Sequence, residues 1–281
     1  MLINYNGQFI DEILFSIPAH NRSFLFGDGL FETIKVFRGK AMFFNQHYVR
    51  FIEGLDTLKM ELPDFWTVPY FKNQVEELVE KNESTNARVR LTFWRAGKGK
   101  YTPENFSAEY IIEISPLENE FYIINKTGLQ IGVFDEIKKM QNKFSEFKSA
   151  NAMIYTMAGI YAKENQLDDV LIKNTTGRPI EMLFSNFFIR KDNVLITPAT
   201  TEGCVNGVMR RVLIKLCRKI GIEVIEKELQ IEEILQADEF FITNTIHGIQ
   251  WVETFEGITY KQEMADILLA KLNEHILDSM V

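Results

Sequence analysis

Strand-like and helix-like segments follow one another along the whole chain, and this mixture most limits the possible folds. Residues 31–37 (FETIKVF) alternate as a half-buried strand does, whereas residues 47–60 carry apolar side chains at helical spacing. Further strands are expected at residues 40–44, 88–94, 109–115, 129–134, 170–173, 184–190 and 239–243, and further helices at residues 70–81, 150–165, 207–220 and 261–280. The pattern predicts an α/β (α+β) fold.

A chain of 281 residues is long enough for one large domain or two modest ones. Residues 115–120 (SPLENE) combine a proline with polar side chains and are typical of a linker. We therefore expect two α/β domains, a smaller one over residues 1–117 and a larger one over residues 118–281. The 46% of hydrophobic and 25% of charged residues agree with globular averages, so disorder is not expected.

Charge and cysteine content exclude several classes of function. The net charge is −8 and no stripe of Lys or Arg stands out, so a nucleic-acid partner is not expected. The first residues (MLINYNGQFIDE) carry an acidic pair where a signal peptide is apolar, and no apolar stretch approaches the ~20 residues that span a membrane. Cys204 and Cys217 cannot build a disulfide framework. We expect a soluble, cytoplasmic protein without membrane contact.

Residues 206–220 (NGVMRRVLIKLCRKI) form the first of three candidate sites. Val208, Val212 and Leu216 mark one apolar face of a helix, and Asn206-Gly207 opens it. The amino end of a helix has unsatisfied N–H donors and a positive dipole end, so it can bind an anion such as phosphate. The alternative is that Asn206 simply caps the helix.

Lys148 and Glu181 are the other two candidates. Lys148 lies just before the helix expected at residues 150–165, whose positive end would lower the pKa of the ammonium, as suits an imine-forming amine. The alternative is a solvated lysine. Glu181 enters an apolar strand, where a carboxylate needs a partner. That partner is either an arginine such as Arg178 or Arg190, or the protonated nitrogen of a bound heterocycle.

Other familiar sites are not predicted. The four histidines have no metal-ligand spacing with one another or with the cysteines, so no metal is expected. Gly27-Asp28-Gly29 and Gly97-Lys98-Gly99 do not complete a dinucleotide fingerprint, and no Walker loop is present.

Five ordered blocks of sequence together resemble a known family. They are RSFLFGDGLFETIKVFRGK at 22–40, HYVRF at 47–51, FKSAN at 147–151, the stretch 181–210 and ADEFFITNT at 237–245. In the most specific block, Glu181 is followed by Asn186-Phe187-Phe188, by Thr197 and by VNGVMR at 205–210. Leu183 departs from it, because a small residue is preferred there. These blocks resemble the class IV aminotransferases, which are pyridoxal-phosphate enzymes of fold type IV.

The resemblance implies an architecture and an assembly. Proteins of fold type IV have a small N-terminal α/β domain and a larger C-terminal pseudo-barrel domain that binds pyridoxal 5'-phosphate. They are typically homodimers in which the partner subunit contributes a loop to the site. The substrate would be a small amino-acid-like molecule.

The resemblance also implies roles for single residues. Lys148 would carry the cofactor on its amine and move the α-proton of the substrate, and Glu181 would pair with the ring nitrogen. The phosphate would be held by Arg50, by the amides of Val208 and Met209, and by the Thr245 hydroxyl. In many branched-chain enzymes a tyrosine follows the lysine by five positions, but that residue is Met153 here, which excludes a tyrosine contact from that position.

The substrate side of the resemblance allows several reactions. The loop RAGKGKY at 95–101 and the run VNGVMR resemble aminodeoxychorismate lyases, which release 4-aminobenzoate and pyruvate in folate precursor synthesis. The lyase is the preferred interpretation. A branched-chain or other L-amino-acid transaminase using 2-oxoglutarate is the alternative, because Arg90 matches a substrate-side arginine and Phe31-Glu32 is typical of aminotransferases. The candidate substrate contacts are Phe31, Arg90, Arg95, Lys100 and Tyr101.

Two further interpretations are disfavoured. D-Amino-acid transaminases use a tyrosine where Phe31 stands, and their Arg-x-His carboxylate trap aligns with Lys100-Tyr101-Thr102 and is missing. A catalytically silent binding protein would be expected to lack Lys148 or Glu181, and both are present.

Overall fold

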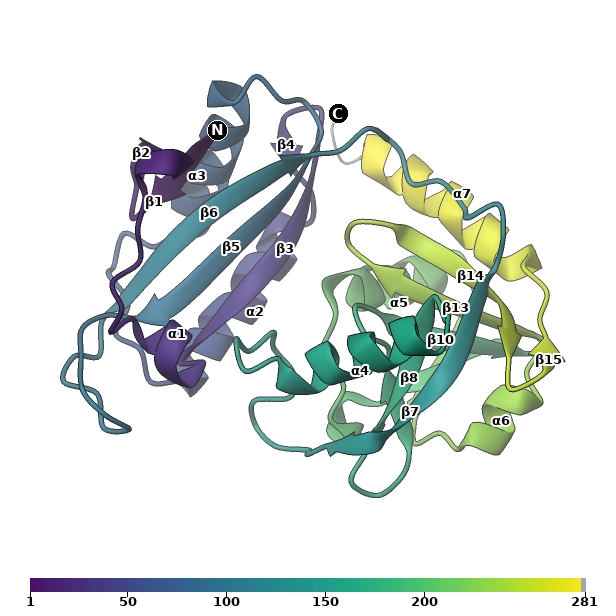
Figure 1. The fold of residues 1–281 in the computed structure, drawn as a ribbon. Helices are drawn as coiled ribbons and strands as arrows, with labels where there is room; N and C mark the ends of the chain where they lie inside the picture. The colour runs from purple at the N-terminus through teal and green to yellow at the C-terminus, as the bar shows by residue number, and fades with distance from the viewer. Residues whose placement is uncertain (279–281) are drawn as a thin grey trace. The chain divides into compact units, whose positions relative to one another are not determined.

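The computed structural model describes residues 1–278, which form two compact units (Figure 1). Unit 1 comprises Met1–Phe121 and Phe147–Ala152, and unit 2 comprises Tyr122–Glu146 and the chain from Met153 onward. The segment Phe147–Ala152, which carries Lys148, thus belongs to unit 1 although it lies in the second half of the sequence. The division into two domains after residue 117 stays a prediction.

Unit 1 is a six-stranded antiparallel sheet with the strand order β2-β1-β6-β5-β3-β4. The strands are β1 (Leu2–Tyr5), β2 (Gln8–Asp11), β3 (Gly29–Phe37), β4 (Lys40–Ala41), β5 (Ala87–Arg95) and β6 (Ala108–Pro116). The helices are a short 3-10 turn (Glu12–Leu14), α1 (Arg22–Phe26), α2 (Phe44–Thr57) and α3 (Val68–Lys81).

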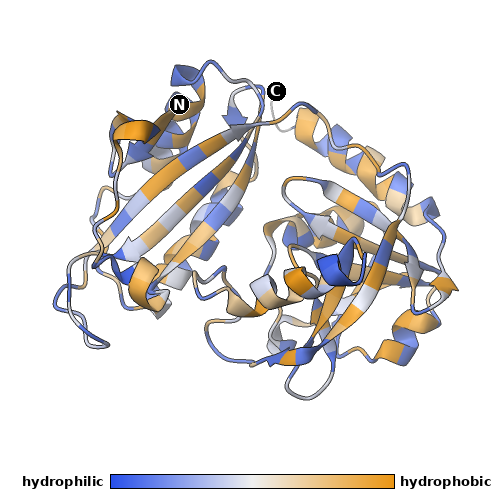
Figure 2. Ribbon diagram, in the orientation of Figure 1, coloured by the Kyte–Doolittle hydropathy of each residue, from blue (hydrophilic) through white to orange (hydrophobic). Residues whose placement is uncertain are grey.

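The two faces of this sheet differ in polarity, as the alternating colours along β5 and β6 show (Figure 2). Ile34, Val89 and Ile114 lie side by side on the face that packs against α2 and α3 and forms the core. Because successive side chains of a strand point to opposite faces, Thr33 and Arg90, which are directly paired, lie on the other face. A residue of β3 therefore reaches either the helices or the polar face, according to its position.

Unit 2 is built on a mixed sheet with the order β12-β11-β10-β13-β14-β7-β8-β9, and β15 pairs with β14. The strands are β7 (Leu129–Lys139), β8 (Asp169–Asn174), β9 (Pro179–Glu181), β10 (Asn186–Lys191), β11 (Val194–Pro198), β12 (Glu223–Lys227), β13 (Glu239–Asn244), β14 (Gly248–Phe255) and β15 (Ile258–Thr259). The helices are α4 (Met153–Glu164), a 3-10 turn (Thr200–Glu202), α5 (Val208–Lys219), α6 (Ile231–Leu235) and α7 (Glu263–Asp278).

Layering in unit 2 follows from which strands the helices contact. Helix α4 packs on β7 and β8, whereas α5 and α7 contact each other and β13. Strand β9, at the end of the sheet, also contacts β10 and β11, so the sheet curls back on itself. The expected mixed α/β, two-part fold is confirmed. Within residues 1–278, no helix has the length and apolar character that crossing a bilayer requires.

Several element boundaries differ from the sequence-based expectations. The helix expected at residues 47–60 spans Phe44–Thr57, and the strand expected at residues 129–134 extends to Lys139. The strand expected at residues 40–44 ends at Ala41. Phe43 has a left-handed φ of 52°, which interrupts the extended backbone, and α2 begins at the next residue, Phe44. The helix expected from residue 150 begins at Met153. The helix expected at 261–280 begins at Glu263, and its last expected residues lie outside the described part of the chain.

Candidate active site

Lys148 lies in unit 1 on a short segment alongside β3. The Phe31 amide donates to the Lys148 carbonyl at 2.8 Å, and the Ala150 amide donates to the Gly29 carbonyl at 2.9 Å. Strand β4 pairs only with the last residues of β3, so the beginning of this edge is open to the segment. Backbone pairing therefore fixes the position of Lys148 on the sheet.

Burial is the main cause of the low pKa of Lys148. Together with the nearby charge of Arg50 it lowers the pKa to about 8, while Glu32 acts in the opposite direction and arginines of β5 add to the lowering. The expected cause, a helix dipole directly after the lysine, is wrong because α4 begins only at Met153. At neutral pH this amine loses its proton far more readily than an ordinary lysine with a pKa of about 10.4.

We predict that Lys148 is acylated with a pH midpoint near 8 in cofactor-free protein. Only the uncharged amine is a nucleophile, and at pH 7 a pKa of about 8 leaves roughly one amine in ten uncharged. The measurement is a short acetic anhydride pulse at pH 6–11, with mass spectrometry of the peptide that contains Lys148. A midpoint above 10 would contradict the buried, cation-flanked environment.

Glu32, His47 and Arg50 form a buried cluster in unit 1. Arg50 donates to Glu32 twice, from Nε to Oε1 at 2.7 Å and from Nη2 to Oε2 at 2.6 Å, and His47 Nδ1 lies 2.6 Å from Oε2. Burial alone would raise the pKa of Glu32, but Arg50 and His47 outweigh it and lower the pKa to about 2. Burial lowers the pKa of His47. The cluster holds the Arg50 guanidinium in one orientation.

The sequence reasoning did not single out Glu32 or His47 as site residues. The sequence did contain a signal for this cluster. Residues 47 and 50 are three apart and lie on one helix face, and the alternation of β3 places Glu32 on the sheet face that α2 covers. The packing of α2 on the sheet determines which strand residue contacts which face of the helix. Local spacing in the sequence does not encode this packing.

Phe31, Arg90 and Lys148 come together on unit 1. The Arg90 guanidinium carbon stands 3.8 Å from the centre of the Phe31 ring, and Lys148 Nζ stands 5.2 Å from the same centre. Arg90 Nε also donates to Thr92 Oγ1 at 3.2 Å. One aromatic ring thus carries two cations by cation–π contact, which suits a site for an acidic substrate.

The remaining candidate substrate residues lie at the end of β5 and in the loop after it. Arg95 is buried and donates to both oxygens of Asp28, at 2.9 and 3.3 Å, and to backbone carbonyls in the turn after α2. The Lys100 carbonyl accepts a hydrogen bond from Arg22 at 2.7 Å, and the Tyr101 ring packs on Phe26 while 90% exposed. Substrate roles for Arg95, Lys100 and Tyr101 stay predictions.

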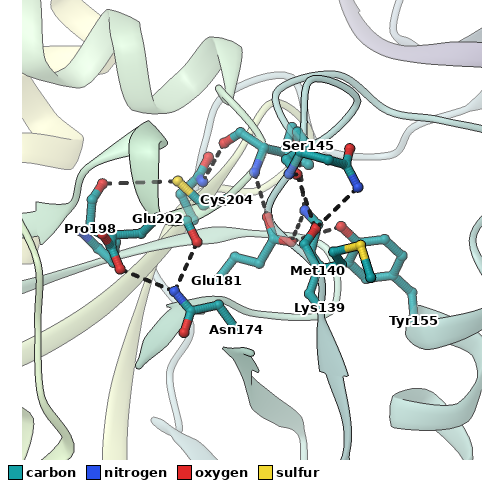
Figure 3. Close-up of polar contacts among 12 residues, drawn as sticks. Lys139, Met140, Ser145, Tyr155, Asn174, Glu181, Pro198, Glu202 and Cys204 are labelled. Carbon is teal, nitrogen blue, oxygen red and sulfur yellow. Dashed lines mark hydrogen bonds and ion pairs between the residues drawn. The ribbon is translucent and has the colours of Figure 1, made fainter. Parts of the chain in front are cut away.

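Glu181 ends β9 in unit 2 and is buried with three donors around it (Figure 3). Lys139 Nζ and the Tyr155 hydroxyl donate to Oε1 at 2.6 and 2.7 Å, and the Val205 amide donates to Oε2 at 2.7 Å. The expected arginine partners are wrong. Arg178 pairs with Glu202 and Glu228 instead, and Arg190 pairs with Glu239 and Glu263.

The amino end of α5 has no side-chain cap. The N-cap residue is Gly207, which has no side chain that could cap the helix. The side-chain amide of the preceding Asn206 donates a hydrogen bond to the Glu146 carboxylate at 3.2 Å. A Cβ on Gly207 would lie 1.9 Å from Asn186 Oδ1, and Asn186 Nδ2 donates to the Val205 carbonyl at 2.8 Å. Only glycine fits at position 207, where the loop packs on β10. Because no side chain caps the first amides of α5, this helix start suits an anion.

Thr245 lies in the turn that follows β13. The Asn244 side-chain oxygen accepts from the amides of Ile246 and His247 at 2.9 and 2.8 Å, and the Thr245 carbonyl accepts from the Tyr122 hydroxyl at 2.8 Å. Side-chain hydrogen bonds of this kind fix a tight turn. The structure thus gives Thr245 a defined backbone position, while its role at a phosphate stays a prediction.

Asp169, at the start of β8, holds the turn that follows Glu181. Its Oδ1 accepts from the Val170 amide at 2.7 Å and from the Leu183 amide at 3.0 Å. Burial raises its pKa to about 7; the two backbone hydrogen bonds lower it and the neighbouring Asp168 raises it further.

We predict that Asp169→Asn stabilises the protein above pH 7. An acid whose folded pKa is raised binds protons more tightly when folded, so its contribution to stability declines as the pH rises from about 4 to 7. Asparagine keeps the acceptor without the charge. We expect a gain of roughly 2 kcal/mol in the free energy of urea unfolding at pH 8 and little change at pH 4. The matched control is exposed Asp64→Asn, and equal effects of the two substitutions would refute the prediction.

Comparisons with known proteins agree with this geometry. The family model for amino-transferase class IV matches residues 29–255. A Methanocaldococcus jannaschii protein provisionally named a branched-chain-amino-acid aminotransferase is 28% identical over 99% of this chain and 96% of its own length. An aminodeoxychorismate lyase of Vibrio harveyi is 26% identical over 92% of this chain and 94% of its own.

Solved structures resemble the fold as a whole. A branched-chain aminotransferase of Thermoproteus uzoniensis superposes with a TM-score of 0.88, covering 98% of this chain and 97% of the other at 21% identity. The family model spans most of the chain, including β3, Lys148, Glu181 and the start of α5. The chain is therefore an enzyme that belongs to the class IV aminotransferase family.

Proposed function

We propose that this enzyme binds pyridoxal 5'-phosphate and acts on an amino-acid-like substrate as a 4-amino-4-deoxychorismate lyase. The chemistry is carried by the Lys148 amine, which is held on β3 with a pKa of about 8. Three observations in the structure fit the cofactor: that amine, the buried Glu181 carboxylate, and the start of α5 without a side-chain cap.

Six residues of the chain would bind the cofactor or move a proton. The Val208 and Met209 amides, the Thr245 hydroxyl and Arg50 would hold the phosphate, and Glu181 would hold the proton on the ring nitrogen. Bound pyridoxal phosphate supplies an electron sink for negative charge at the substrate's α-carbon. Lys148 would take the α-proton, because its pKa lies near the working pH.

The lyase assignment rests on two sequence segments, at residues 205–210 and 95–101. The run VNGVMR at 205–210 begins α5, and the loop RAGKGKY at 95–101 follows β5; both resemble the lyases. The Vibrio harveyi relative, named an aminodeoxychorismate lyase, shares nearly the full length of the chain. In the lyase reaction the substrate's side chain departs, giving 4-aminobenzoate and pyruvate.

An L-amino-acid transaminase is the second candidate, because Arg90 favours it. Arg90 lies on the polar face of the sheet beside Phe31, and it lines a cavity of about 210 Å³ together with Arg88, Glu113 and Ser115. A guanidinium in this place suits the carboxylate of an acceptor such as 2-oxoglutarate.

The two candidates are separated by one assay. Protein loaded with pyridoxal phosphate is mixed with freshly generated aminodeoxychorismate and no keto acid, and 4-aminobenzoate fluorescence and pyruvate are followed. Catalytic, equimolar release of both products is expected. Without release, transamination of an L-amino-acid panel with 2-oxoglutarate would make the transaminase the function instead.

We further propose that the enzyme is a homodimer, as family members typically are. In unit 1, Ile13, Leu14, Phe24 and Tyr101 are 84, 79, 77 and 90% exposed. Exposed large apolar side chains that are adjacent, such as Ile13 and Leu14, suit contact with a second copy of the chain. Sedimentation equilibrium should give twice the chain mass of 32.7 kDa, and a monomer at micromolar concentration would refute the dimer.

A further inference from the structure

The partners of Glu181 come from three separate segments of unit 2. Lys139 is the last residue of β7, and Tyr155 lies in the first turn of α4 (Figure 3). Val205 belongs to the loop before α5. The Glu181 side chain is 3% exposed and that of Lys139 is 12% exposed. The ion pair between them is therefore almost fully removed from water.

Lys139 is the cation that compensates the Glu181 charge. Nζ lies 2.6 Å from Oε1, and the arginines close in sequence, Arg178 and Arg190, pair with other carboxylates. A buried carboxylate without a compensating charge is strongly unfavourable, because water no longer stabilises it. Lys139 thus stabilises Glu181 within the chain itself, whether or not a ligand is bound.

Tyr155 fixes the orientation of the carboxylate. Burial and the charge of Glu181 raise the pKa of the Tyr155 phenol well above its ordinary value, so the hydroxyl stays protonated and donates a hydrogen bond to Oε1. A carboxylate offers about four acceptor positions. Lys139, Tyr155 and Val205 use three of them, two on Oε1 and one on Oε2. The remaining position is on Oε2.

We propose that Lys139 and Tyr155 are positioning residues that hold Glu181 in place before the cofactor binds, with Lys139 as its resident counter-ion. The inference rests on the proposed function in one respect, namely that a protonated ring nitrogen takes the remaining position on Oε2. Glu181 then faces one cation in the cofactor-free chain and two in the loaded enzyme. Loss of Lys139 should therefore harm the cofactor-free state more.

The first test is a double-mutant cycle on the full-length, cofactor-free protein. Lys139→Met, Glu181→Gln and the double variant are compared with wild type by urea unfolding at pH 7.5. Each single change leaves one buried group unpaired, so we expect the unfolding equilibrium constant to rise about 100-fold or more. The double variant should return to within about tenfold of wild type, and Lys139→Arg should keep most of the stability.

A matched control uses an ion pair that is open to water. Lys271 pairs with Glu274, and the two side chains are 45 and 61% exposed, so Lys271→Met should change the equilibrium constant by only a few-fold. Additive effects in the cycle would overturn the proposal. If a single variant does not fold, folding of the double variant supports it, and failure of the double variant to fold also overturns it.

The second test separates this inference from the proposed function. Pyridoxal phosphate is added to wild type and to Lys139→Met, and the rise in thermal midpoint and the dissociation constant are measured. The midpoint should rise more in Lys139→Met, because the ring-nitrogen proton replaces the lost counter-ion. An equal or smaller rise overturns the inference. If the cycle is coupled but the cofactor binds neither protein, the proposed function fails while Lys139 remains the counter-ion.

Discussion

Replacing Lys148 with alanine is expected to lower turnover by about four orders of magnitude, because one amine would both carry the cofactor and move the α-proton. The exposed neighbour Lys143, changed to alanine, should keep wild-type turnover. Borohydride treatment of the loaded enzyme, followed by digestion and mass spectrometry, should add the cofactor mass to the Lys148 peptide of wild type only.

The loss of turnover in Lys148→Ala should not be accompanied by a loss of folding stability. The folded pKa of Lys148, about 8, lies below the usual value, so the charged amine opposes folding below pH 8, and this penalty fades as the pH rises toward 10.5. Cofactor-free Lys148→Ala should therefore unfold at a urea concentration equal to or above that of wild type at pH 7. Retained turnover in a folded variant would remove Lys148 from the mechanism.

Replacing Glu32 with alanine is expected to destabilise the protein by about 3–5 kcal/mol at pH 7, because Arg50 and His47 would stay buried without their acceptor. The measurement is the free energy of urea unfolding. The solvent-exposed acid Glu53, changed to alanine in the same helix–strand layer, should stay within about 0.5 kcal/mol of wild type.

The effect of Glu32 should also depend on pH. Because its folded pKa of about 2 lies below the ordinary 4.5, its stabilising contribution is complete above pH 4.5 and is lost as the pH falls from 4.5 to 2. The difference between wild type and Glu32→Gln should shrink over that window. A loss below 1 kcal/mol for Glu32→Ala at pH 7 would show that the cluster does not stabilise the fold.

Local patterns of the sequence predicted much of this protein. Alternation identified β3, β5 and β6 nearly to their ends, and helical spacing identified α2, α3 and α5, because each half-buried element must repeat its apolar side chains with its own period. Ordered motifs predicted the family, which the match over residues 29–255 shows. Element starts were predicted less accurately, since the left-handed Phe43 and the non-helical residues before α4 have no periodic signature.

The partners of the charged groups were decided only by the tertiary structure. The sequence indicated that Glu181 needs a partner, but it suggested arginines close in sequence. The strand order β7-β8-β9 and the packing of α4 on β7 and β8 bring Lys139 and Tyr155 to it instead. Lys148 likewise has a low pKa because it is buried near Arg50, and not because a helix begins after it. A single residue's need for compensation is a local property of its chemistry. The group that compensates it is set by which distant segments pack together, and local spacing carries no record of that.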